Sequence, residues 1–166
     1  MRSVLSTHSR LVMWHRLKNF FSSLRTYNTL SPDLGMRQQV NQQLQHRPEL
    51  GCKEWFERFY CSQGINDLIA TFAYTYLGRY SGLPMGRILP SDRLEEDLHW
   101  TKICWFDWET TLCNDFWKTF GVDLSPWIYE CQAHTVGELI YLLNWLMQEH
   151  RQWTKDQGVN RSEWGK

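Results

Sequence analysis

Four side chains in the second half of the chain have the types that general acid–base chemistry uses. His99, His134, Asp107 and Glu109 could exchange protons with a substrate. The sequence contains no glycine-rich phosphate loop, nucleophile elbow or metal pair that would complete such a site. We therefore expect no catalytic residue and predict that the protein is not an enzyme.

The cysteines offer zinc binding as a second chemistry. Cys131 and His134 have the spacing of a ligand pair, and His99, Cys104 and Cys113 precede them. A second closely spaced pair, which zinc sites normally contain, is missing. The chain has 5 cysteines, an odd number, and no Cys-x-x-Cys pair, which is typical of a reducing compartment. We predict free thiols, no metal site and a cytoplasmic location.

Aromatic residues are frequent, with 10 Trp, 8 Phe and 7 Tyr. Large rings fill hydrophobic cores, and Trp and Tyr also dominate interface hot spots. Both uses stay open for the tryptophans near residue 100. The predicted partner-binding set combines three of these tryptophans with three carboxylates: Trp100, Trp105, Asp107, Trp108, Glu109 and Asp115.

The formal net charge is zero, but the charged residues are distributed unevenly. Residues 1–60 carry nine Lys/Arg and four Asp/Glu, whereas residues 61–166 carry nine and fourteen. An acidic domain repels phosphate, so we expect no nucleic acid partner. The acidic half favours a protein partner with a basic surface.

Residues 1–30 contain no acidic side chain and show a basic amphipathic pattern. Their apolar residues recur at three- and four-residue steps, which predicts a helix. Such a helix can lie on an anionic membrane surface, dock on a partner, or act as a transit peptide, and packing on the domain is equally open. The residues assigned to membrane or partner contact within the segment 1–26 are Arg10, Trp14, Arg16, Lys18 and Phe21. Membrane contact would make the protein peripheral.

Helical patterns recur along the rest of the chain, without useful strand alternation. Ser31-Pro32-Asp33 is a helix-start signal. Further helices are expected at 53–60, 65–80, 105–120 and 135–150. Thr135 and Glu138 form a capping box for the last of them.

Together these patterns predict an all-α protein in three parts. Residues 1–50 would be a basic N-terminal extension, partly helical or flexible. Residues 51–150 would form the helical domain, and residues 151–166 a polar tail. No stretch approaches the ~18 apolar residues that a membrane span requires.

Three motifs follow one another in the order found in acyl carrier proteins. Their sequences are Asp92-Arg93-Leu94-Glu95-Glu96-Asp97-Leu98, Phe120-Gly121-Val122-Asp123-Leu124 and Thr135-Val136-Gly137-Glu138-Leu139. The chain is also similar to the uncharacterised acyl-carrier-like proteins of the DUF1493 type. The resemblance covers residues 62–148 and implies an acyl-carrier-like three- to four-helix bundle. In such a bundle Leu94 and Leu98 would plug the core.

The family attaches its phosphopantetheine arm to a serine at the start of the second helix. Counting from the neighbouring motifs places that serine near Lys102 or Phe106, and neither residue is a serine. The chain has no serine between Ser91 and Ser125. Thr101 is the nearest hydroxyl, but its β-branched side chain is more hindered. We therefore expect no cofactor.

These observations predict a non-enzymatic, carrier-like protein-interaction module, such as an adaptor or a regulatory or assembly factor. One alternative is an unusual acyl or lipid carrier, although large aromatic residues fill space that carriers leave to aliphatic side chains. Another is a protein attached to a membrane surface through its basic N-terminus.

Overall fold

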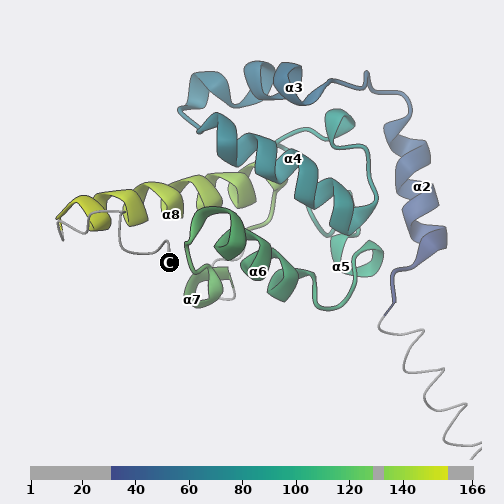
Figure 1. The fold of residues 1–166 in the computed structure, drawn as a ribbon. Coiled ribbons are helices and arrows are strands. Elements are labelled where there is room, and N and C mark those ends of the chain that lie inside the picture. Colours follow the sequence, from purple (N-terminus) through teal and green to yellow (C-terminus); the bar gives the residue numbers. More distant parts are fainter. Residues whose placement is uncertain (1–30, 129–132, 157–166) are drawn as a thin grey trace, which may run out of the picture.

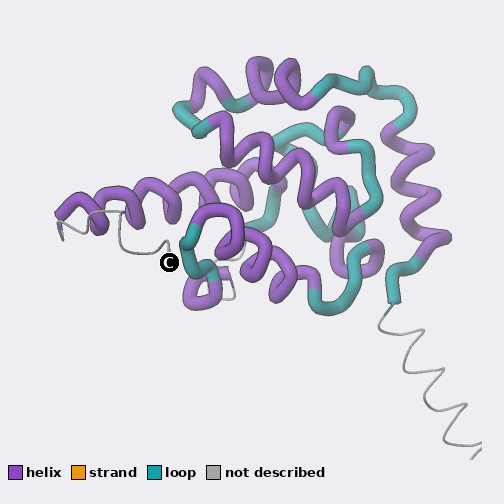
Figure 2. Tube along the Cα trace, in the orientation of Figure 1, coloured by secondary structure: helices purple, strands orange, loops and turns teal. Residues whose placement is uncertain are grey.

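The computed structural model describes residues 31–128 and 133–156, which form helices joined by loops (Figures 1 and 2). The described residues contain no β-strand, so the predicted all-α class is confirmed. The α-helices are α2 Leu34–Leu44, α3 Cys52–Phe59, α4 Asp67–Ser81, α5 Trp100–Ile103, α6 Trp108–Phe120, α7 Ser125–Ile128 and α8 Val136–Asp156. Two short 3-10 helices, η1 Cys61–Gln63 and η2 Met85–Arg87, lie between them.

Helix α4 lies at the centre of the arrangement in Figure 1 and contacts α3 and α8. It begins where the side chain of Asn66 accepts a hydrogen bond from the amide of Leu68 at 2.9 Å. It ends at Gly82, whose φ of 68° suits a residue without a Cβ atom. Phe72 of α4 packs edge-on against Phe116 of α6, with ring centroids 5.2 Å apart.

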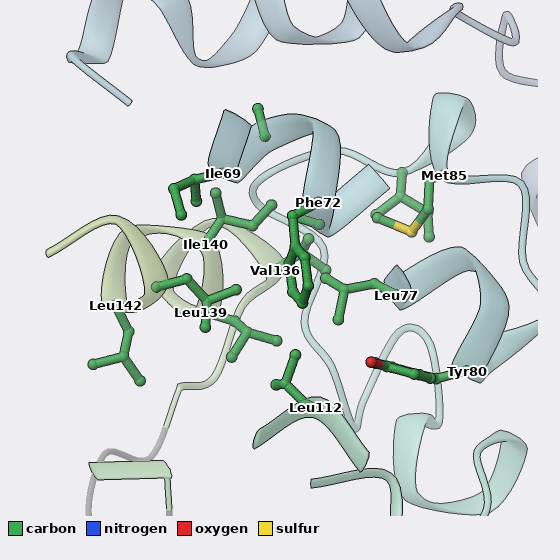
Figure 3. Packing of buried hydrophobic residues seen from close by; sticks show 14 of the residues in the cluster. Ile69, Phe72, Leu77, Tyr80, Met85, Leu112, Val136, Leu139, Ile140 and Leu142 are labelled. Atoms are coloured by element: carbon green, nitrogen blue, oxygen red, sulfur yellow. The ribbon is translucent and has the colours of Figure 1, made fainter. Parts of the chain in front are cut away.

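The hydrophobic core forms where α4, α6 and α8 meet, as Figure 3 shows. The helix expected at 135–150 is present as α8, and the residues of its apolar stripe are all buried: Val136, Leu139, Ile140, Leu143, Leu146 and Met147. One polar residue lies within this stripe. The side chain of Asn144 is buried and accepts a hydrogen bond from the amide of Asn66 at 2.9 Å. This bond ties α8 to the residue that caps α4.

Part of the predicted N-terminal extension, residues 1–50, packs into the core of the helical domain. Val40 and Leu44 of α2 belong to the same buried core as the later helices. The guanidinium of Arg37 donates a hydrogen bond to the carbonyl of Ile103 at 2.6 Å. The core therefore continues across the predicted boundary at residue 50. At the other end, α8 runs through Asp156, past the boundary predicted at residue 150.

Backbone hydrogen bonds join the long loop between α4 and α5 to residues at the start of α8. Leu94 and Leu98 are buried in the core, as expected. The amide of Leu94 donates to the carbonyl of His134 at 2.8 Å, and Gly137 donates to Pro90 at 2.9 Å. This loop therefore lies against the start of α8.

The predicted helix at 105–120 begins later than expected. Chain direction changes after α5, because Cys104 has extended backbone angles, with φ −89° and ψ 164°. Trp105 and Phe106 lie in the link that follows and are 46% and 64% exposed. The regular helix α6 starts at Trp108. In the described part of the chain, no helix is both long and apolar enough to cross a bilayer.

Candidate functional site

A hollow of about 300 Å³ lies where the long loop, α5, α6 and the start of α8 come together. Three carboxylates line it, those of Glu95, Glu96 and Glu109, and two aromatic side chains form walls, Trp100 and Trp108. We call this space the acidic hollow, and its lining is completed by Leu94, Thr101, Ile128, Ala133, His134 and Leu139. The described residues that line it include no lysine or arginine.

The loop that carries Glu95 and Glu96 is fixed by an ion pair at its base. The guanidinium of Arg93 lies 3.0 Å from a carboxylate oxygen of Asp97, and the same carboxylate accepts the amide of Arg93 at 2.9 Å. These hydrogen bonds hold the pKa of Asp97 below its ordinary value. The backbone of Arg93 also pairs with Thr135 in an isolated bridge. The loop is thus anchored to the start of α8.

Glu95 connects the loop to α5. Its carboxylate accepts the hydroxyl of Thr101 at 2.7 Å and the amide of the same residue at 3.2 Å. The amide of Trp100 in turn donates to the carbonyl of Leu94 at 2.8 Å. The hydroxyl nearest to the expected serine position therefore already donates to a carboxylate.

The aromatic walls combine one buried and one half-buried indole. Trp100 is fully buried and meets Trp108 edge-on, with centroids 5.9 Å apart and an interplanar angle of 82°. The Nε1 of Trp100 has no hydrogen-bond acceptor among the described residues. Buried indole N–H groups normally find one, so this donor is unsatisfied within the described structure.

Glu109 stands in the first turn of α6 and is only partly exposed. Burial disfavours the charged carboxylate and raises the pKa of Glu109 above its ordinary value of 4.5. A cation placed in the hollow would stabilise the charged form. The arrangement therefore suits an ammonium or guanidinium group, which carboxylates attract and aromatic faces also bind.

The structure divides the predicted partner-binding set. Trp100, Trp108 and Glu109 meet at the acidic hollow. Of the two uses left open for the tryptophans, Trp100 has the core one, because its side chain is fully buried. Trp105 and Asp107 are exposed outside the lining.

The carboxylate of Asp115 contacts side chains of the protein itself, those of Tyr80 and Lys118. It accepts the hydroxyl of Tyr80 at 2.8 Å, and a second oxygen lies 4.0 Å from the ammonium of Lys118. Burial and this hydrogen bond raise the pKa of Tyr80. Asp115 therefore connects α6 to α4 and does not line the acidic hollow.

The remaining predicted positions include three described residues near the expected serine and five in the N-terminal segment. Thr101 lines the acidic hollow, whereas Lys102 is exposed on α5 and Phe106 is exposed beyond it. Five further predicted contact residues lie outside the described residues: Arg10, Trp14, Arg16, Lys18 and Phe21.

Sequence reasoning missed Glu95 and Glu96 as site residues. Both lie inside the loop motif, so a signal was present, but their meeting with Glu109 depends on how the loop packs. His134 also lines the hollow, whereas its proposed acid–base partners His99 and Asp107 do not. No group of three potential metal ligands gathers within residues 31–128 and 133–156.

A second, larger hollow of about 980 Å³ was not expected. Its lining is largely apolar and includes Trp127, Tyr141 and Trp145. Tyr60 and Ile65, from the segment between α3 and α4, also line it. We call these five residues the aromatic hollow. Trp127 and Trp145 meet edge-on, with centroids 5.4 Å apart. The spacing of Tyr141 and Trp145, one helical turn apart on α8, was the available signal.

We compared the chain with models of protein families, with curated proteins and with solved structures, and none of the three comparisons gave a match.

Proposed function

We propose that this protein is a non-enzymatic interaction module with a carrier-like helical framework, and that it binds a basic segment of a protein partner at the acidic hollow. The observation that carries the proposal is that Glu95, Glu96 and Glu109 line one hollow together with two indoles, and that its described lining contains no lysine or arginine. Trp108 offers a half-buried aromatic face to the same space. A lysine or arginine side chain matches both features.

The carrier-like part of the proposal rests on the order of three motifs and on the helices that follow them. Leu94 and Leu98 are buried between the helices, as the resemblance implies. The expected serine position is occupied by α5 and the exposed link after it. Because Thr101 is held by Glu95, a prosthetic arm is not part of the proposal.

The expected affinity is modest. Exposed charge pairs contribute about 0.2–1 kcal/mol each, and a cation–π contact adds about 0.5–2 kcal/mol. Screening by salt weakens exposed pairs, since the Debye length is about 8 Å at physiological ionic strength. A partner would therefore gain specificity and a faster encounter from the acidic hollow, with further affinity from neighbouring contacts.

The test uses an acetylated, amidated tri-arginine peptide as the probe and the intact protein. We expect saturable binding that weakens as salt is added. The triple change Glu95→Gln, Glu96→Gln and Glu109→Gln should weaken the affinity about ten-fold or more. The matched control changes three exposed glutamates elsewhere to glutamine, namely Glu54, Glu57 and Glu149.

The control decides between a site and general electrostatic attraction. Both triple variants lose the same formal charge. If the control variant loses as much affinity as the hollow variant, the acidic hollow is not the binding site. A tri-glutamate peptide should not bind either protein, because it repeats the charge of the hollow.

The aromatic hollow supports a second candidate, an acyl or other lipid ligand. Its volume of about 980 Å³ and its three exposed or partly exposed rings suit an apolar chain. A fluorescent fatty acid should bind the unmodified protein and lose affinity on Trp145→Ala. Trp117→Ala is the control, since Trp117 is 57% exposed and lies outside that lining. Equal affinity of both variants and the unmodified protein would exclude this ligand site.

A further inference from the structure

The aromatic hollow combines buried apolar residues with aromatic walls that stay open to solvent. Ile65 and Leu142 line it and are 5% and 7% exposed. The indoles of Trp127 and Trp145 are 43% and 36% exposed, and Tyr141 is exposed one helical turn before Trp145 on α8. The described chain therefore leaves an apolar surface uncovered around a space large enough for a small ligand.

Two exposed residues of the same lining are polar but uncharged. Gln63 belongs to η1, and Ser91 belongs to the long loop between α4 and α5. An amide and a hydroxyl can each donate and accept hydrogen bonds without carrying a charge. The two residues therefore suit a neutral headgroup, such as an ester or an alcohol.

The charge of the lining disfavours an anionic headgroup. Glu138 is the only charged residue among the described residues that line the aromatic hollow. Its carboxylate accepts the amides of His134 at 2.7 Å and Thr135 at 3.2 Å, so its position at the start of α8 is fixed. A ligand carboxylate would meet this negative charge, and the described lining contains no lysine or arginine to offset the repulsion.

A cation lies beside the loop wall, but it is already paired. Arg47 makes two hydrogen bonds to the carboxylate of Asp92, the residue after Ser91, and donates to the carbonyl of Arg87 at 3.1 Å. Burial raises the pKa of Tyr60, which lines the hollow, and the negative charge of Asp92 raises this pKa further. The wall formed by Tyr60 is therefore close to a negative charge, despite the pairing of Asp92 with Arg47.

We propose that the aromatic hollow binds an uncharged acyl compound, such as an ester or a long-chain alcohol, and that Glu138 makes the site discriminate against a carboxylate headgroup. The apolar chain would cover the exposed rings, and the headgroup would lie beside Gln63 and Ser91. The selectivity comes from repulsion of the competitor as well as from attraction of the ligand. It rests on the second candidate function, an acyl ligand at this site, and specifies its headgroup.

The test compares lauric acid with methyl laurate in displacing the fluorescent fatty acid from the intact protein at neutral pH. Both compounds are used below the concentrations at which they aggregate. We expect both to bind and the ester to bind more tightly. Because the ester is also the more apolar compound, the decisive quantity is how the ratio of the two affinities changes between variants.

Glu138→Gln removes the charge and keeps a residue type that a capping box accepts. It should raise the affinity for lauric acid about three- to five-fold, as expected for an exposed charge, and leave the affinity for methyl laurate within about two-fold. Glu54→Gln is the control, because Glu54 is exposed on α3 and lies outside the lining. It should change the ratio of the two affinities less than about two-fold.

Gln63→Lys tests the same selectivity by adding a cation to the lining. It should shift the ratio towards lauric acid by a similar factor of about three to five. Gln43→Lys makes the same substitution at an exposed position of α2 outside the lining, and it should leave the ratio within about two-fold. Since Gln63→Lys does not alter the capping box, it decides the question alone if Glu138→Gln does not fold.

The outcomes separate this inference from the acyl candidate on which it rests. Binding of both compounds with a ratio that Gln63→Lys leaves unchanged, or that the control variants change as much, supports the acyl site and overturns the headgroup selectivity. A folded Glu138→Gln protein with an unchanged ratio excludes Glu138 as the discriminating residue. Failure of both compounds to bind the unmodified protein contradicts the acyl candidate and the inference together.

Discussion

Arg47 and Asp92, which are 45 positions apart in the sequence, form a bidentate ion pair between the segment after α2 and the long loop. The Nη1–Oδ2 and Nη2–Oδ1 distances are 2.5 and 3.0 Å. The carboxylate is nearly buried and also accepts the amide of Leu89 at 2.8 Å. The pair fixes the loop that carries Glu95 and Glu96, so it links the segment after α2 to the acidic hollow.

Removing the arginine from this pair should destabilise the fold. Arg47→Ala leaves the buried carboxylate of Asp92 without its cation, which should cost about 3 kcal/mol of unfolding free energy. Lys53→Ala, in an exposed pair 3.7 Å from Glu57, should cost less than about 0.5 kcal/mol. Urea denaturation followed by circular dichroism measures both. Equal midpoints for the two variants would show that Arg47 does not anchor the loop.

Gly86 should not tolerate a side chain. A Cβ atom there would lie 2.0 Å from the carbonyl oxygen of Leu50, a backbone atom that cannot move without shifting the chain. The amide of Leu50 also donates to the carbonyl of Gly86 at 3.1 Å. Gly86→Ala should therefore destabilise the protein by about 3 kcal/mol or more. Gly51→Ala is the control, because nothing lies within 4 Å of its added Cβ. Thermal unfolding should separate the two variants clearly, and similar melting temperatures would contradict the close approach.

The thiols should differ in reactivity. Burial raises the pKa of Cys104 to about 12, so little of the reactive thiolate forms at neutral pH, whereas Cys61 is exposed. Iodoacetamide should alkylate Cys61 at least about 100-fold faster than Cys104 in the native protein. Peptide mass mapping over time measures each rate. In concentrated urea the two rates should become similar, and similar rates in native buffer would argue against the buried position of Cys104.

Binding of the tri-arginine probe should weaken as the pH falls. Because burial raises the pKa of Glu109, this carboxylate takes up a proton at a higher pH than an ordinary glutamate and loses its attraction for a cation. The affinity should therefore be full at neutral pH and decline as the pH falls through the raised pKa of Glu109. Glu109→Gln should remove the part of the decline that begins at the higher pH.

Other titratable groups at the hollow require their own controls in this experiment. Glu95, Glu96 and His134 line the same hollow and also carry titratable side chains. His134→Gln should leave the Glu109 component in place. A pH profile that Glu109→Gln does not alter would exclude Glu109 from probe binding.

Local signals in the sequence predicted much of the helical framework. The stripe on α8 follows from its spacing, and its first turn follows from the capping box: Thr135 and Glu138 exchange hydrogen bonds at 3.2 Å. Gly121, with a φ of 70°, ends α6 directly after residue 120, where the predicted helix was expected to end. These features were predictable because each depends on residues within one or two turns of one another.

The sequence by itself also determined that no serine lies between Ser91 and Ser125 and that acidic groups gather in the second half. Only the tertiary structure decided which aromatic residues are core and which are surface, because Trp100 and Trp105 lie five positions apart and only Trp100 is buried. It also decided that Asp115 accepts a hydrogen bond from Tyr80 and that Glu95 and Glu109 line the same hollow. These outcomes depend on how the long loop and α5 pack against distant helices, and periodicity within one segment carries no information about such contacts.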